Sequence, residues 1–241
     1  MRAVILAGGK GTRLRPYTTI FPKPLVPIDG MPIVEIVIRQ LKFYGFQRVT
    51  LSVGYLAELL MAYFGDGGKL GVAVEYSKED QPLGTTGALA LIPGLTQTFL
   101  VMNGDILTTL DYGELIEYHQ KNCATATIAM HRRSVKIDLG VLETNEKNEL
   151  VGYIEKPVYD YRVSMGIYIF EPKVLEFIRP GERLDLPDLI HLLLQNGEKV
   201  MGFPYNGYWL DIGRPDDYEQ AVEEFSRLRS QFLREGQRVD E

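Results

Sequence analysis

Apolar and polar positions along the chain follow two periods, one typical of strands and one typical of helices. Residues 49–53 and 72–76 alternate apolar and polar side chains, which predicts two strands. Residues 32–44 place apolar side chains at helical spacing, which predicts a helix. Short apolar runs at 4–6 and 99–102 fit buried strands, although their pattern alone does not exclude buried helix. Further helices are expected at 56–64, 84–91, 112–121, 185–197 and about 215–234.

The order of these elements predicts the fold class. Strands and helices alternate through the first hundred residues, which favours an α/β fold, a Rossmann-like three-layer sandwich with a mainly parallel, mixed central sheet. The second half is less regular, with strands expected at 125–130 and 163–170 and a hairpin within 140–155. No repeat or low-complexity linker divides the chain, so residues 1–241 are expected to form one domain with a tail at 235–241.

Composition and charge narrow the classes of partner. The net charge of −6, with acidic and basic residues mixed, disfavours a nucleic-acid-binding surface but not a nucleotide held by local cations. The single cysteine, Cys123, cannot form an internal disulfide, which indicates a reducing compartment, and we expect it to be a small core residue. No apolar run is long enough to cross a membrane and no signal-peptide pattern opens the chain. We therefore expect a cytoplasmic protein with no membrane partner.

The apolar run at 4–6 breaks at once into a glycine-rich loop. Three glycines within residues 8–11 allow positive φ angles and a close approach of the backbone to a ligand. Successive N–H groups in such a loop can form an anion nest, and Lys10, Arg13 and Arg15 place cations beside it. An ordinary strand-to-helix turn is the alternative on the glycines alone.

Spacing excludes two better-known phosphate loops. In a P-loop, four residues separate the first glycine from the second. Four residues after Gly8 the next position is Arg13, and four residues after Gly9 it is Leu14, so neither glycine starts a P-loop. The dinucleotide pattern GxGxxG starts at Gly9 and Gly11 but ends on Leu14, which argues against a dinucleotide-dependent oxidoreductase.

What remains is GGxGTRLxP at 8–16 followed by FPKPL at 21–25. This pair of motifs resembles the signature of the sugar-1-phosphate nucleotidylyltransferases, also called nucleotide-sugar pyrophosphorylases, and the resemblance covers essentially the whole chain. It implies transfer of a nucleoside monophosphate from a nucleoside triphosphate to a sugar 1-phosphate, with release of pyrophosphate. Many relatives continue into a left-handed β-helix domain. Because this sequence ends after its last expected helix, we expect no such C-terminal domain.

Two aspartates stand where this family keeps its metal ligands. Asp105 follows the strand at 99–102, at the carboxyl edge where open α/β sheets bind ligands, and Asp211 lies in the motif WLDIG. Carboxylates, together with phosphates and water, are the ligands that Mg²⁺ takes, so the resemblance implies Mg²⁺ as the cofactor. Either aspartate could instead cap a turn. With Arg13 and Lys23, which by resemblance contact the triphosphate, they are the expected catalytic residues.

The segment EDQPLGTTG at 79–87 matches the family's base-binding loop. A carboxylate only accepts hydrogen bonds, and guanine offers two adjacent donors, so Glu79 favours GTP. The sequence PLGT at 82–85 also resembles the corresponding segment of the guanylyltransferases for mannose or heptose 1-phosphate. The alternatives are a uridylyl- or thymidylyltransferase for glucose 1-phosphate or another sugar, and a catalytically silent regulatory subunit. The expected nucleotide-binding residues are Leu6, Ala7, Gly8, Gly9, Gly11, Thr12, Arg13, Lys23, Glu79, Pro82, Gly84, Thr85, Asn103 and Gly104.

The sugar 1-phosphate is expected to bind a third block of the signature, EKP at 155–157. By resemblance, Glu155 holds sugar hydroxyls, Lys156 holds the sugar phosphate, and the backbone at Gly140 and Gly166 passes close to the sugar. Ser164 departs from the pattern, since relatives often have Asn there. The oligomeric state is left open, with a homo-oligomer as one alternative.

Overall fold

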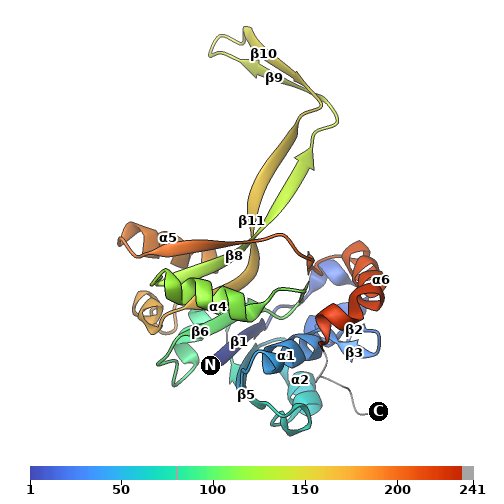
Figure 1. Cartoon of the computed structure of the whole chain (residues 1–241), viewed down its shortest axis with the longest axis vertical. Coiled ribbons are helices and arrows are strands. Elements are labelled where there is room, and N and C mark those ends of the chain that lie inside the picture. The colour runs from blue at the N-terminus through green and yellow to red at the C-terminus, as the bar shows by residue number, and fades with distance from the viewer. Residues whose placement is uncertain (80, 235–241) are drawn as a thin grey trace.

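The computed structural model describes residues 1–79 and 81–234, and a seven-stranded mixed sheet forms its centre (Figure 1). The strand order is β12-β8-β11-β6-β1-β4-β5. β1 is parallel to β4 and β6, β4 is parallel to β5, and β12 is parallel to β8, whereas β11 is antiparallel to both β6 and β8. The mainly parallel, mixed sheet predicted from the sequence is confirmed. The strands are β1 (Arg2–Ala7), β4 (Arg48–Val53), β5 (Ala73–Lys78), β6 (Phe99–Asn103), β8 (Ala126–Lys136), β11 (Val158–Phe170) and β12 (Val200–Tyr205).

Alternation along β1 divides the core into two layers. Ala3 and Ile5 face one side of the sheet, whereas Val4 faces the other, and all three are fully buried because helices cover both faces. The first face packs against α1 (Ile33–Phe43), α2 (Ala57–Phe64) and α4 (Tyr112–Lys121), and the second against α5 (Leu186–Gln195) and the 3-10 segments η5 (Ala88–Leu91) and η6 (Pro172–Phe177). The three-layer sandwich is therefore confirmed.

A third apolar cluster lies beside the glycine-rich loop. It joins Leu14 of that loop to Ile212 and to Phe225 of α6 (Pro215–Phe232). The same region holds two short strands, β7 (Ile106–Thr108) and β13 (Trp209–Asp211), which pair antiparallel. The hairpin β2 (Pro27–Ile28) and β3 (Met31–Pro32) closes it. The C-terminal helix thus packs against the segments that carry the two predicted metal ligands.

Two strands run far beyond the body of the molecule. β8 and β11 continue past the predicted ends of their core segments and lead into the hairpin β9 (Gly140–Thr144) and β10 (Leu150–Glu155), which Figure 1 shows standing clear of the other elements. The predicted hairpin within 140–155 is confirmed, but the length of β8 and β11 was underestimated. Their outer halves pair only with each other, so no buried, continuous apolar run marks them.

Several local expectations differ from the structure. The helix expected at 84–91 is one α-turn, α3 (Gly84–Gly87), followed by η5. The last helix ends at Phe232, and the predicted tail at 235–241 lies outside the described residues. Cys123 is exposed at φ 47° in the turn after α4, so its expected core position is wrong, because the chain must reverse there before β8. Among the described residues, no helix combines the length and apolarity needed to span a membrane.

The start of α5 is capped by a residue of another element. The side chain of Asp185 makes no capping bond to its own helix and instead accepts a hydrogen bond from the Thr85 N–H at 3.2 Å. The Thr85 hydroxyl in turn accepts from the Leu186 N–H at 2.7 Å. The free donor at the helix N-terminus is therefore satisfied by a residue that is distant in sequence, which ties α5 to α3.

A buried amide of α1 links β7, which follows Asp105, to the C-terminal end of α6. Gln40 of α1 is 5% exposed, and its Nε2 donates to the carbonyl oxygens of Thr108 at 2.8 Å and Phe232 at 3.2 Å. We expect Gln40→Met to leave both carbonyls without that donor and to lower the free energy of unfolding by about 1–3 kcal/mol. Chemical denaturation measures the change, and Gln120→Met on the exposed face of α4 is the control, expected to stay within about 0.5 kcal/mol. Equal effects in the two variants would contradict the role of Gln40.

Candidate active site

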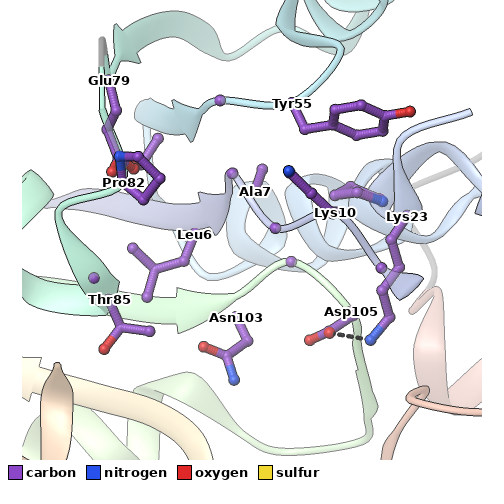
Figure 2. A pocket seen from close by; sticks show the side chains of 18 of the residues that line it. Leu6, Ala7, Lys10, Lys23, Tyr55, Glu79, Pro82, Thr85, Asn103 and Asp105 are labelled. Atoms are coloured by element: carbon purple, nitrogen blue, oxygen red, sulfur yellow. Dashed lines mark hydrogen bonds and ion pairs between the residues drawn. The ribbon is translucent and has the colours of Figure 1, made fainter. Parts of the chain in front are cut away.

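A cavity of about 670 Å³ opens at the carboxyl ends of β1, β4 and β6 (Figure 2). Because these strands are parallel and adjacent, the loops that follow them meet at one edge of the sheet, as in other open α/β folds. The walls are residues 6–13 and 103–105, together with Lys23, Pro24, Ser52, Gly54, Tyr55, Glu79, Gln81, Pro82, Gly84, Thr85, Asp185 and Gly213. Every predicted nucleotide-binding residue lines this cavity, together with Asp105.

The glycine-rich loop is held tightly at Gly11. Gly11 has φ 60°, and the Thr18 hydroxyl donates to its carbonyl oxygen at 2.7 Å. A Cβ at Gly11 would lie 3.0 Å from side-chain carbons of both Thr18 and Lys23. The loop then enters a single 3-10 turn, Thr12–Leu14, whose Leu14 is fully buried. The backbone of the loop is thereby packed against Lys23, the lysine of the FPKPL motif.

The side chains of Lys23 and Asp105 form an ion pair at one end of the cavity (Figure 2). Lys23 is 8% exposed, and its Nζ contacts Oδ2 of Asp105. The other oxygen of Asp105, Oδ1, is buried and has no hydrogen-bond partner among the described residues. A buried acceptor without a donor is costly, so this oxygen is available to a cation that enters the cavity.

Asp211 lies next to Asp105 on the paired strand. Asp211 is in register with Ile106, and the Ile212 N–H donates to the Asp105 carbonyl oxygen at 3.1 Å. Although Asp211 is exposed as a residue, desolvation of its carboxylate and the negative charge of Asp105 raise its pKa, while Lys23 and Arg13 act to lower it. Two carboxylates that repel each other, one with a free oxygen, fit a shared divalent cation. No group of three or more His, Cys, Asp or Glu side chains in the described parts of the chain makes a metal site, so phosphates or water would supply the remaining ligands.

A second cavity, of about 510 Å³, adjoins the first. Arg13 and Gly213 line both cavities, and Asp211 lines the second. The other walls bring together three further guanidinium groups, from Arg132, Arg133 and Arg214, with His131 and Trp209. The sequence did not predict these residues, because the arginines of β8 and Arg214 come together only when β8 and β13 are placed in the fold.

The predicted sugar-phosphate residues are divided between two places. Gly166 lies beside the first cavity, since a Cβ there would be 2.6 Å from Nδ2 of Asn103. Ser164 forms a 2.8 Å hydrogen bond with the Tyr168 hydroxyl. By contrast, Gly140 and Glu155 lie on the β9–β10 hairpin and Lys156 directly follows it. None of the five expected residues lines either cavity.

On that hairpin, the expected sugar contacts have neighbours of their own. The Tyr153 hydroxyl donates to Glu155 at 2.6 Å, and the Tyr153 ring lies where a Cβ of Gly140 would be. Lys156 has φ 45° at the turn between β10 and β11. Within one chain, therefore, the third block of the signature is separated from the other two.

Glu79 lines the opposite end of the first cavity from the ion pair (Figure 2). Its Oε2 accepts from the Leu83 N–H at 2.9 Å, and its Oε1 accepts from the Ser52 hydroxyl at 3.3 Å. A carboxylate has about four acceptor positions, so these two bonds hold the loop while leaving capacity for a ligand.

Sequence reasoning missed several cavity residues. Ser52 lies near the end of β4, and Gly54 and Tyr55 follow that strand. Their signal was available, because a strand parallel to β1 must end at the same edge of the sheet. Asp185 reaches the cavity from the other half of the chain through its bond to Thr85. No local pattern in the sequence indicates that contact.

Comparison with known proteins shows the family to which the chain belongs. Residues 2–227 match the Nucleotidyl transferase family, and the chain belongs to it. It is 34% identical to the mannose-1-phosphate guanylyltransferase of Mycobacterium tuberculosis over 232 residues, covering 93% of this chain and 64% of that protein. It is 36% identical to the UTP–glucose-1-phosphate uridylyltransferase of Synechocystis over 242 residues, covering 92% of this chain and 62% of that protein. The chain thus spans less than two thirds of the length of these relatives.

The fold is also that of a solved structure. HddC from Yersinia pseudotuberculosis has a TM-score of 0.72 and 29% sequence identity to this chain, covering 93% of this chain and 99% of HddC. The same protein has been solved in complex with GMP-PN, with a TM-score of 0.69.

The ion pair at the end of the cavity makes a testable contribution to stability. In metal-free buffer, we expect Lys23→Met to leave the Asp105 carboxylate without its partner and to lower the free energy of unfolding by about 1–3 kcal/mol. Lys10→Met, at an exposed lysine of the same cavity, is the control and should change it by less than about 0.5 kcal/mol. The double variant Lys23→Met/Asp105→Asn should lose less than the sum of the single losses. Additive losses would show that the two side chains are not coupled.

Proposed function

We propose that this chain transfers a nucleoside monophosphate from a nucleoside triphosphate, with GTP favoured, to a sugar 1-phosphate of the mannose or heptose type. The products are a nucleoside diphosphate sugar and pyrophosphate. The observation that carries the proposal is the first cavity, in which a glycine-rich loop, a buried lysine–aspartate pair and an acceptor-bearing loop share one space. The guanylyltransferase of Mycobacterium tuberculosis among the relatives supports it.

In this proposal the nucleotide lies across the glycine-rich loop. Its base contacts the segment from Glu79 to Thr85 at one end of the cavity, and its phosphates lie at the Lys23 end (Figure 2). The backbone N–H groups of residues 8–12 act as an anion nest, and Lys23 and Arg13 supply positive charge. Because the base and the phosphates bind at opposite ends of the cavity, a whole nucleotide binds better than a free base or a free phosphate.

The second substrate is placed in the adjoining cavity. Arg13, which lines both cavities, and the guanidinium groups of Arg132, Arg133 and Arg214 suit a phosphate monoester. A phosphate oxygen of the sugar 1-phosphate attacks the α-phosphorus of the nucleotide. A new P–O bond forms, the bond to the β-phosphate oxygen breaks, and pyrophosphate leaves with its electron pair. The nucleophile is already ionised at neutral pH, so this chain needs to align two polyanions and neutralise their charge rather than supply a general base.

Asp105 and Asp211 would hold the divalent metal that enzymes of this family generally use, and we propose Mg²⁺. The unpartnered Oδ1 of Asp105 and the raised pKa of Asp211 support a cation at this place. Oxygen ligands from one or two carboxylates, completed by phosphates and water, suit Mg²⁺. When bound, the ion supplies neutralisation of the phosphate charge.

Two alternatives remain for the reaction. The uridylyltransferase among the relatives supports a uridylyl- or thymidylyltransferase acting on glucose 1-phosphate or another sugar. A catalytically silent regulatory subunit would be expected to lose the charged motif residues, whereas this chain retains Arg13, Lys23, Asp105, Lys156 and Asp211.

We also propose that the enzyme is soluble and cytoplasmic. Its lone cysteine cannot form an internal disulfide, which fits a reducing compartment.

The proposed reaction is tested by pyrophosphate release over a grid of nucleoside triphosphates and sugar 1-phosphates. We expect release only when both substrates and Mg²⁺ are present, with GTP and a mannose- or heptose-type phosphate the best pair. Absence of pyrophosphate release with every pair would overturn the proposed function.

The assignment of Asp105 and Asp211 as metal ligands predicts that replacing either carboxylate by an amide greatly lowers turnover. Asp105→Asn and Asp211→Asn each remove a charged ligand oxygen, and we expect either to lower turnover at least ~100-fold, comparable to removing one key electrostatic group. In the wild type, Mg²⁺ with nucleotide should raise the melting temperature, and this shift should disappear in both variants. Near-normal turnover of Asp105→Asn with Mg²⁺ would show that the assignment is wrong.

The base assignment predicts a change of nucleotide preference. In Glu79→Gln, the amide oxygen still accepts from Leu83 N–H and the amide nitrogen can donate to the Ser52 hydroxyl, so the loop should be retained. Toward guanine, however, a donor replaces an acceptor, which costs on the order of 1–3 kcal/mol. We expect a roughly ten- to hundredfold loss of preference for GTP, measured as kcat/KM for GTP, UTP and dTTP. A wild type that prefers dTTP or UTP would refute the guanine assignment, and an unchanged ratio would show that Glu79 does not contact the base.

A further inference from the structure

The long β-ribbon that projects from the sheet is the least covered part of the described chain. We call residues 131–164 the arm, with a stem (131–137 and 158–164) and a tip (138–157). Figure 1 shows the tip far from every helix of the body. Nine of the eighteen large apolar side chains exposed in the described residues lie between positions 135 and 161 of this arm. Contiguous exposed apolar surface of this kind marks an interaction site.

The tip is apolar on both of its faces. Leu142 and Tyr153 are cross-strand partners and are each 59% exposed. The next pair, Val141 and Ile154, points to the opposite face, because successive side chains of a strand alternate. β9 and β10 form a two-stranded sheet that pairs with no other strand. A lone two-stranded ribbon is marginally stable in water, and its free edges invite pairing with another chain.

The charges of the arm are divided along its length. The stem carries a net charge of +3 and the tip a net charge of −3. Among the stem charges, Arg132 is paired with Asp160 at 2.7 Å, and Lys136 is paired with Asp138 of the tip at 3.0 Å. Arg133 and Arg162 lie on exposed strand positions. The charged residues are Arg132, Arg133, Lys136, Asp160 and Arg162 in the stem, and Asp138, Glu143, Glu146, Lys147, Glu149, Glu155 and Lys156 in the tip.

We propose that two copies of this chain pair through their arms about a two-fold axis, so that the tip of each arm packs along the stem of the other. A two-fold interface must be self-complementary, and two arms that cross in opposite directions bring each acidic tip against a basic stem. The arm has 34 residues, which is comparable to the roughly 20–30 residues a side of a stable protein interface. The same contact covers the apolar side chains of both tips.

The oligomeric state tests the pairing itself. We expect the full chain to sediment as a dimer in analytical ultracentrifugation, and Leu142→Ser/Tyr153→Ser to weaken dimerisation at least ~10-fold, which corresponds to losing about 1.4 kcal/mol of apolar contact. Leu59→Ser/Leu194→Ser removes two exposed apolar side chains from the body and is the matched control, expected to leave the dimer unchanged. A monomeric wild type, or a dimer insensitive to the arm variant, would overturn the proposal.

Charge reversal tests the opposite direction of the two arms. Lys136→Glu/Arg162→Glu changes the stem from +3 to −1, and Glu143→Lys/Glu146→Lys changes the tip from −3 to +1. Each variant alone should dimerise more weakly than the wild type, because its tips and stems then carry the same sign of charge. An equal mixture should form heterodimers, seen by native mass spectrometry, because both of its tip–stem contacts join opposite charges. Failure of the mixture to form heterodimers would overturn the tip-to-stem pairing.

Discussion

The ion pair between Lys23 and Asp105 joins two segments that are 82 residues apart and closes one end of the central cavity. Most of the site geometry follows from it. The lysine is held by flanking prolines and by the close packing of Gly11, and the aspartate by the strand pairing that also carries Asp211. The pair uses only one oxygen of Asp105, so a second buried oxygen and a second carboxylate remain next to it. A surplus of negative charge at this place is unfavourable for the isolated chain and suits a cation that arrives with its ligands.

Local charge, rather than net charge, matches this site to anionic ligands. The chain carries a net charge of −6, yet four guanidinium groups surround the second cavity and Arg13 lines both cavities. Arginine suits phosphate because its planar fork donates two parallel hydrogen bonds. If these two adjoining cavities bind anions as proposed, with a cation near Asp105 and Asp211, they would align two phosphate compounds. This arrangement supports the proposed transfer reaction without any titrating base.

The arm carries part of the chain away from the body and from both cavities. Its stem borders the second cavity, whereas its tip extends away from the body with apolar side chains on both faces (Figure 1). A two-stranded ribbon of this kind gains little stability from its own packing, so the proposed contact with a second copy would add to it. The division of charge between stem and tip makes a second copy of the same arm a suitable surface.

The sequence by itself determined the layered α/β fold, the glycine-rich loop and the strand-end position of Asp105, because each depends on local periodicity or on turn chemistry within a few residues. The proximity of Asp211 to Asp105, the arginines of the second cavity and the bond between Asp185 and Thr85 were decided only by the tertiary structure. The length of β8 and β11 belongs to the same group. Their outer halves are largely exposed and mix polar with apolar side chains. They become strands because each supplies the other's hydrogen bonds, which is a pairing between distant segments that no local pattern encodes.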